Sequence, residues 1–168
     1  MTDPIIRPAY SNWPRYQANL RDAVARLTPE QLAIQPTPER WPLWATIGHL
    51  ACQRVSWLCG FLNEPGGDTT PFPDALYRCP GDEYLEPAIS APELVLGLES
   101  TFRVIEGVLE RTTLSSMDEL IVRDFEGDVW RHTRGSVIQR VFVHDVTHIE
   151  ELNETFSRAG LPMISLWD

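Results

Sequence analysis

Apolar residues recur three or four positions apart in four long stretches of the chain, and this spacing is typical of amphipathic helices. The pattern predicts helices over about 13–27, 42–62, 91–111 and 134–160. Residues that favour helix starts stand before or just inside these stretches. They are Asn12, Pro42, Ser90 with Glu93, and Thr133, while Thr28 with Gln31 is spaced as a capping box for a short extra turn.

Two other segments complete the predicted fold. Residues 63–90 form a long connection rich in Pro, Gly and Asp, and "LIVRDFEGDVWRH" (120–132) alternates around a Glu126–Gly127 turn, which predicts a small hairpin. We therefore expect an all-α protein, a four-helix bundle with a small hairpin before the last helix, in a single domain of residues 1–168. Short connections favour simple up-and-down order, but the 63–90 connection also permits a crossover.

The charge of the chain excludes several classes of partner. The formal net charge is −10 at pH 7, which argues against nucleic acid and anionic membranes, because both attract basic surfaces. The longest apolar stretch, "LWATIGHLACQRVSWLCGFL", contains His, Gln and Arg, so we expect a core helix and no membrane span. The first ten residues lack the basic start and apolar run of a signal peptide. A cytoplasmic location is the resulting expectation.

Three cysteines, Cys52, Cys59 and Cys79, form no CxxC pair. An odd number without framework spacing is typical of a reducing compartment. We therefore expect small buried or half-buried thiols.

The stretch "RVFVHDVTHIEELN" (140–153) carries two of the four histidines of the chain. His144 and His148 are four apart, so on a helix their Cβ atoms lie about 5–6 Å apart on one face. Two imidazole nitrogens can then bind one ion at about 2.0–2.1 Å. His49 falls at the edge of the apolar arc of the second helix and is the natural third ligand. The sequence therefore predicts a metal site of His49, His144 and His148 inside the bundle.

Other interpretations of these residues stay open. An inward-facing histidine is more often a satisfied core residue than a ligand, and His132, near the last helix cap, is expected to be a surface or capping group. Asp145 falls inside the apolar arc and needs a partner, either an Arg or Trp of another helix or a ligand imidazole that it would orient. "HDVTH" also resembles the metalloprotease pattern HExxH, but Asp is one methylene shorter than Glu and only 20 residues follow His148.

Two blocks of the sequence resemble the DinB-like proteins of the YfiT/DinB superfamily. They are "LTPEQLAIQPTPERWPLWATIGHLACQ" and "TRGSVIQRVFVHDVTHIEELNETFSRAGLP". The resemblance implies a four-helix bundle of up-down-down-up order and a divalent metal ion. The histidine of the family's "GHL" falls on His49, and those of its HxxxH fall on His144 and His148. Some relatives have Glu at the first position of that pair.

Characterised members of this family handle thiols, so the resemblance implies an enzyme that activates a low-molecular-weight thiol for transfer to a small electrophile. Two alternatives are a hydrolase in which the metal activates water, and a noncatalytic metal-binding or dimerisation module. The metal would be Zn, Ni or Fe, the partner a small molecule, and a homodimer is possible. No catalytic side chain stands out, although Gln53, one turn after His49, could contact a ligand.

Overall fold

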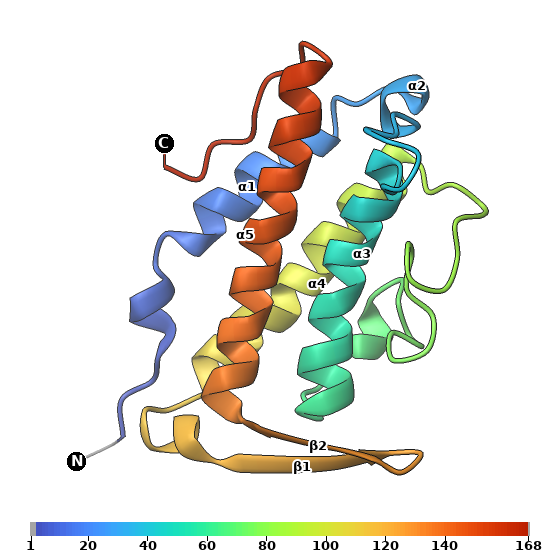
Figure 1. Ribbon diagram of the computed structural model, residues 1–168. Helices are drawn as coiled ribbons and strands as arrows, with labels where there is room; N and C mark the ends of the chain where they lie inside the picture. The colour runs from blue at the N-terminus through green and yellow to red at the C-terminus, as the bar shows by residue number, and fades with distance from the viewer. Residues whose placement is uncertain (1–2, 168) are drawn as a thin grey trace.

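The computed structural model describes residues 3–167 of the chain and is mostly helical, with one small sheet (Figure 1). The four long helices are α1 (Trp13–Val24), α3 (Leu43–Val55), α4 (Ala91–Arg111) and α5 (Arg134–Arg158). A short helix α2 (Pro29–Leu32) follows α1, and a π-helical turn (Ser56–Phe61) extends α3. The sheet consists of β1 (Leu120–Phe125) and β2 (Asp128–Thr133).

Helix α3 is central to the packing, because it contacts both α4 and α5, while α1 packs on α4. Figure 1 shows α3 and α5 side by side, with the β1–β2 hairpin lying across the end of the molecule where α5 begins. Helices α3 and α5 therefore supply facing surfaces along much of their length. This pairing brings residues near 50 and near 145 of the sequence together.

The predicted hairpin is confirmed. Strands β1 and β2 are antiparallel, and Leu120 pairs with Thr133 at the open end. Glu126 and Gly127 both have positive φ, 57° and 96°. Positive φ at both central residues is what the two-residue hairpin turn that matches the twist of the strands requires. Ile121 on β1 is buried under α5, so the hairpin closes one end of the core.

The predicted helix starts are mostly correct. Thr28 and Gln31 form a capping box, the Ser90 N–H donates to Glu93, and the Thr133 hydroxyl accepts from the Ser136 N–H. The prediction for Asn12 is wrong: its backbone is already helical and its side chain makes no capping bond. The first helix also ends at Val24, three residues early, and the second changes from α to π geometry after Val55.

Two apolar clusters fill the interior. One joins α1, α3, α4 and the C-terminal half of α5, and the other lies toward the hairpin. Leu50 and Leu152 are fully buried in the first, and Leu58 and Ile138 in the second. Two charged residues, Arg54 on α3 and Asp145 on α5, lie near the boundary between the two clusters and are 1% and 0% exposed. Charges at this depth require partners within the protein.

The cysteine prediction is wrong. Cys52 on α3 and Cys79 in the 63–90 connection form a disulfide, and only Cys59 is a free thiol. The cysteines therefore give no support for a reducing compartment. The disulfide attaches the long connection to α3, one helical turn after His49. Within residues 3–167, no helix is long and apolar enough to cross a membrane.

Candidate metal centre

The three histidines named from the sequence come together between α3 and α5. Nε2 of His144 lies 3.1 Å from Nε2 of His49 and 3.1 Å from Nε2 of His148. The ligand atoms of all three residues lie within 4.8 Å of one another. Because His144 and His148 are one turn apart on α5 and His49 faces them from α3, the helix pairing alone produces this convergence. Binding of a metal ion there stays a prediction.

The site is mostly removed from solvent, and this affects its protonation. Burial lowers the pKa of His49, although Asp82 nearby opposes this effect. Burial, together with the neighbouring imidazoles of His148 and His49, lowers the pKa of His144 to about 3. These two rings are therefore neutral at neutral pH, and a neutral imidazole has the lone pair that a metal ligand needs.

The nitrogen positions fit a shared cation. A ring nitrogen carries either a hydrogen or a lone pair, so Nε2 of His144 can make one well-directed hydrogen bond but has two nitrogen neighbours at 3.1 Å. Two imidazole nitrogens on one tetrahedral zinc ion lie about 3.3 Å apart. The observed spacings are close to this value, so the donor set suits a divalent ion of the borderline type that imidazole binds.

The outward nitrogen of His148 has a carboxylate partner. Nδ1 of His148 lies 2.8 Å from Oε2 of Glu151, and the other oxygen of Glu151 accepts from Arg40 at 2.7 Å. Neither Glu151 nor Arg40 was predicted from the sequence. Glu151 could have been predicted, because a residue three positions after His148 lies on the same helix face.

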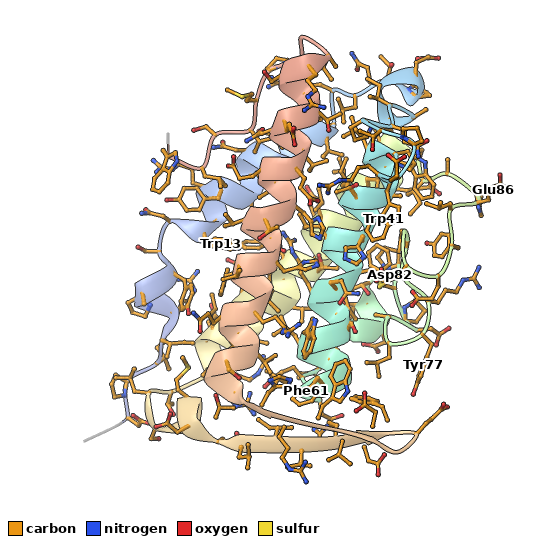
Figure 2. All side chains as sticks on the ribbon, in the orientation of Figure 1. Trp13, Trp41, Phe61, Tyr77, Asp82 and Glu86 are labelled. Carbon is orange, nitrogen blue, oxygen red and sulfur yellow. A yellow bond between two sulfur atoms is a disulfide. The ribbon has the colours of Figure 1, made fainter. Side chains whose placement is uncertain are left out.

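The surroundings of His49 come from two loops. Trp41 packs on the His49 ring, with 4.8 Å between ring centres, and Asp82 Oδ2 lies 3.2 Å from Nδ1. This nitrogen is buried and has no well-aligned hydrogen bond among the described residues. Figure 2 shows Trp41 and Asp82 beside α3, on the side of the 63–90 connection. A Cβ at Gly48 would lie 2.9 Å from Pro80, so glycine permits this close approach.

Gln53 donates to Asp82 Oδ2 at 3.2 Å, so its amide is engaged by the connection. Its predicted contact with a ligand stays a prediction. Nothing in the sequence pointed to Asp82, because the path of the 63–90 connection had no periodicity from which to infer it.

Asp145 pairs with an Arg of another helix, which was one of the two roles predicted for it. Its carboxylate accepts from Nε of Arg54 at 3.0 Å and from Nη2 at 2.7 Å. The Arg54 guanidinium also donates to Gln17 on α1 and to Thr101 on α4, so all four long helices meet at this group. Asp145 therefore faces Arg54 and not a ligand imidazole.

The prediction for His132 is wrong. Its ring is partly buried and lies edge-on to Trp57 and Phe61, with ring centres 5.7 and 5.4 Å apart. The hairpin register places it opposite Ile121, on the face that covers the core. It is thus an aromatic packing residue of the hairpin, on β2 before α5 begins, and is not part of the histidine cluster.

A pocket of about 440 Å³ opens beside the histidine cluster. Its walls combine apolar and charged groups, as is usual for small-molecule sites. His148 borders this space, so a ligand in the pocket would lie next to the cluster. Among the residues that line it are Arg40, Trp41, Leu43, Glu151, Leu152 and Glu154.

Fold and site together define a mostly helical protein with a candidate three-histidine metal centre. The family model of the DinB superfamily matches residues 13–152, and the chain belongs to that superfamily. A similar solved structure is that of a DinB-like protein from Bacillus cereus ATCC 10987. It is 15% identical, with a TM-score of 0.70 over 99% of this chain and 100% of that one, and so supports the fold alone. A comparison with curated proteins finds no match.

Proposed function

We propose that this protein holds a divalent metal ion with His49, His144 and His148 and activates a low-molecular-weight thiol for transfer to a small electrophile. The observation that supports this proposal is the convergence of three imidazole nitrogens within 4.8 Å beside a pocket of about 440 Å³. A divalent ion at such a site lowers the pKa of a thiol, so that the nucleophilic thiolate forms at neutral pH.

The residues of the chain would serve this reaction by binding and by excluding water. The apolar part of the pocket wall is formed by Trp41, Leu43 and Leu152, and the carbon skeleton of a small molecule can pack against it. Arg40 and Glu154 supply polar contacts at the same pocket. The short path from this wall to His148 would let one end of the substrate reach the cluster while the rest stays in the pocket.

The finer features of the fold belong to the same proposal. We propose that α1, α3, α4 and α5 form a four-helix bundle of up-down-down-up order, which the contacts of α3 with α4 and α5 and of α1 with α4 support. The metal is proposed to be Zn, Ni or Fe, since imidazole suits all three. A single domain, a cytoplasmic location and a homodimer are proposed with it.

The test is elemental analysis followed by an activity assay. Protein purified without a metal-affinity tag should contain about one divalent ion per chain, and the His148→Ala variant should contain far less. The loaded protein is then incubated with cellular thiols and a chromogenic electrophile. Metal-dependent consumption of the electrophile supports the proposal. Hydrolysis of an ester without added thiol would instead assign the hydrolase alternative, and a loaded protein inactive in both assays would favour the noncatalytic module.

A further inference from the structure

In a neutral imidazole, the hydrogen-bond partner of one ring nitrogen decides whether the other nitrogen carries a hydrogen or a free lone pair. Oε2 of Glu151 lies 2.8 Å from Nδ1 of His148. An ionised carboxylate only accepts hydrogen bonds, so this contact places the hydrogen of a neutral His148 ring on Nδ1. Nε2, which faces His144 at 3.1 Å, is then left with its lone pair toward the cluster.

Arg40 holds this carboxylate from the opposite side. Its Nη1 donates to Oε1 of Glu151 at 2.7 Å, across 111 residues of sequence. Arg40 belongs to the segment between α2 and α3, whereas Glu151 belongs to α5, so two separate elements fix the carboxylate. The adjacent Trp41 packs on His49. One short segment therefore touches the surroundings of two of the three histidines.

We propose that Glu151 is a positioning residue, which holds His148 in the tautomer that binds a cation, and that Arg40 keeps Glu151 in place. This inference rests on the proposed function, since it concerns the same three histidines. Arg40 and Glu151 also line the pocket. The pocket wall is therefore joined to the proposed metal ligand His148 by two consecutive hydrogen bonds. Partners of this kind orient ligating imidazoles and raise their basicity.

The chain contains a matched control. Glu154 lies three residues after Glu151 on α5, lines the same pocket and forms an ion pair with Arg158. Within residues 3–167, its side chain forms no hydrogen bond or ion pair with a histidine. Glu151→Gln and Glu154→Gln each remove one negative charge from the same pocket wall. A difference between the two variants therefore reports the contact with His148 and not the general loss of charge.

The first measurement uses the metal-free protein, so it does not depend on metal binding. Long-range proton–nitrogen NMR spectra distinguish the two tautomers of a histidine ring. We expect the wild type and Glu154→Gln to carry the His148 hydrogen on Nδ1, and Glu151→Gln to shift this hydrogen to Nε2 in a measurable fraction. A wild-type ring protonated on Nε2, or a tautomer unchanged in Glu151→Gln, would overturn the inference.

The second measurement is the affinity for Zn²⁺ and Co²⁺, by competition with a chromogenic chelator. Glu151→Gln should weaken binding by about 10- to 100-fold. Glu154→Gln, which loses only an exposed ion pair, should change it by about threefold or less. Equal affinities of the two variants would refute the positioning role even if the wild type binds metal. A wild type that binds neither ion would refute the proposed metal site, while the tautomer spectra would still decide the role of Glu151.

Discussion

Helices α3 and α5 face each other through two buried polar groups that differ in one respect. At the first, Arg54 of α3 meets Asp145 of α5, and every nitrogen of the guanidinium has an acceptor within 3.4 Å. At the second, about one turn away, His49 of α3 meets His144 and His148 of α5 with nitrogen facing nitrogen. The ion pair is complete within the chain, whereas the imidazole nitrogens of the cluster face one another at a spacing that a cation could share.

This difference distinguishes a buried polar group that stabilises the fold from one that could also bind a ligand. A charge pair with all its partners supplied by the protein has no unused bonding capacity to offer a ligand. Three convergent imidazoles do have that capacity, and a pocket lies beside them. Burial alone would not have told the two groups apart, because all of these residues lie in the interior or at its margin.

The largest loss of stability is expected when one partner of the buried Arg54–Asp145 ion pair is removed. Asp145→Ala leaves the Arg54 charge buried without its partner, which should lower the free energy of unfolding by about 3–5 kcal/mol. Urea denaturation measures this. In the matched double variant, Arg54→Met with Asp145→Leu, no charge is left unpaired, so the loss should be smaller than in the single variant. A double variant that is less stable than Asp145→Ala would contradict this account.

A somewhat smaller loss is expected from the disulfide that attaches the loop beside His49. Cys52 and Cys79 are separated by 27 positions, and a crosslink of that span stabilises a fold by about 2–4 kcal/mol. The Cys52→Ser, Cys79→Ser variant should lose this amount in urea denaturation. Cys59→Ser, which alters the free thiol, is the control and should stay within about 1 kcal/mol of the wild type. Similar losses in both variants would show that the crosslink contributes little.

The histidine cluster is expected to gain stability from added Zn²⁺ if the proposed site binds it. Zn²⁺ at 100 times its Kd raises the free energy of unfolding by about 2.7 kcal/mol when only the folded chain binds it. Thermal unfolding with Zn²⁺ and with EDTA measures this gain. His148→Ala should remain folded and lose the gain. The same stabilisation in wild type and variant would place the ion elsewhere on the molecule.

The smallest effect is expected at His49. The Asp82 carboxylate is 40% exposed and lies 3.2 Å from Nδ1 without good alignment, so Asp82→Asn should weaken Zn²⁺ binding by about tenfold or less. Glu86→Gln is the control, because Figure 2 shows Glu86 on the outer side of the same connection. Chelator competition measures both. A loss for Asp82→Asn as large as that for Glu151→Gln would mean that the two contacts are equivalent.

The sequence predicted the histidine cluster because helical spacing decides it. An i, i+4 pair must share a helix face, and His49, at the edge of the apolar arc of its helix, was expected to face inward. The same reasoning predicted that Asp145 would need a partner, although not that Arg54 supplies it. That choice depends on how two helices are aligned along each other, which no single-helix pattern specifies.

What the sequence did not predict lies mostly in the irregular segments. The Cys52–Cys79 disulfide and the position of Asp82 both depend on the path by which the 63–90 connection returns to α3. His132 was a different kind of error. The Glu126–Gly127 turn already fixed its pairing with Ile121, and alternation along the strand then puts it on the covered face.

Asp145 directly follows His144 in the chain, and on a helix neighbouring side chains point about 100° apart. Any twist of α5 that took His144 away from His49 would also have to break the contact of Asp145 with Arg54. The ion pair thus acts as a rotational lock on α5 with respect to α3. Because this lock does not involve the imidazoles, it would keep the three histidines of the proposed site convergent before an ion binds, so binding would not first require them to be brought together.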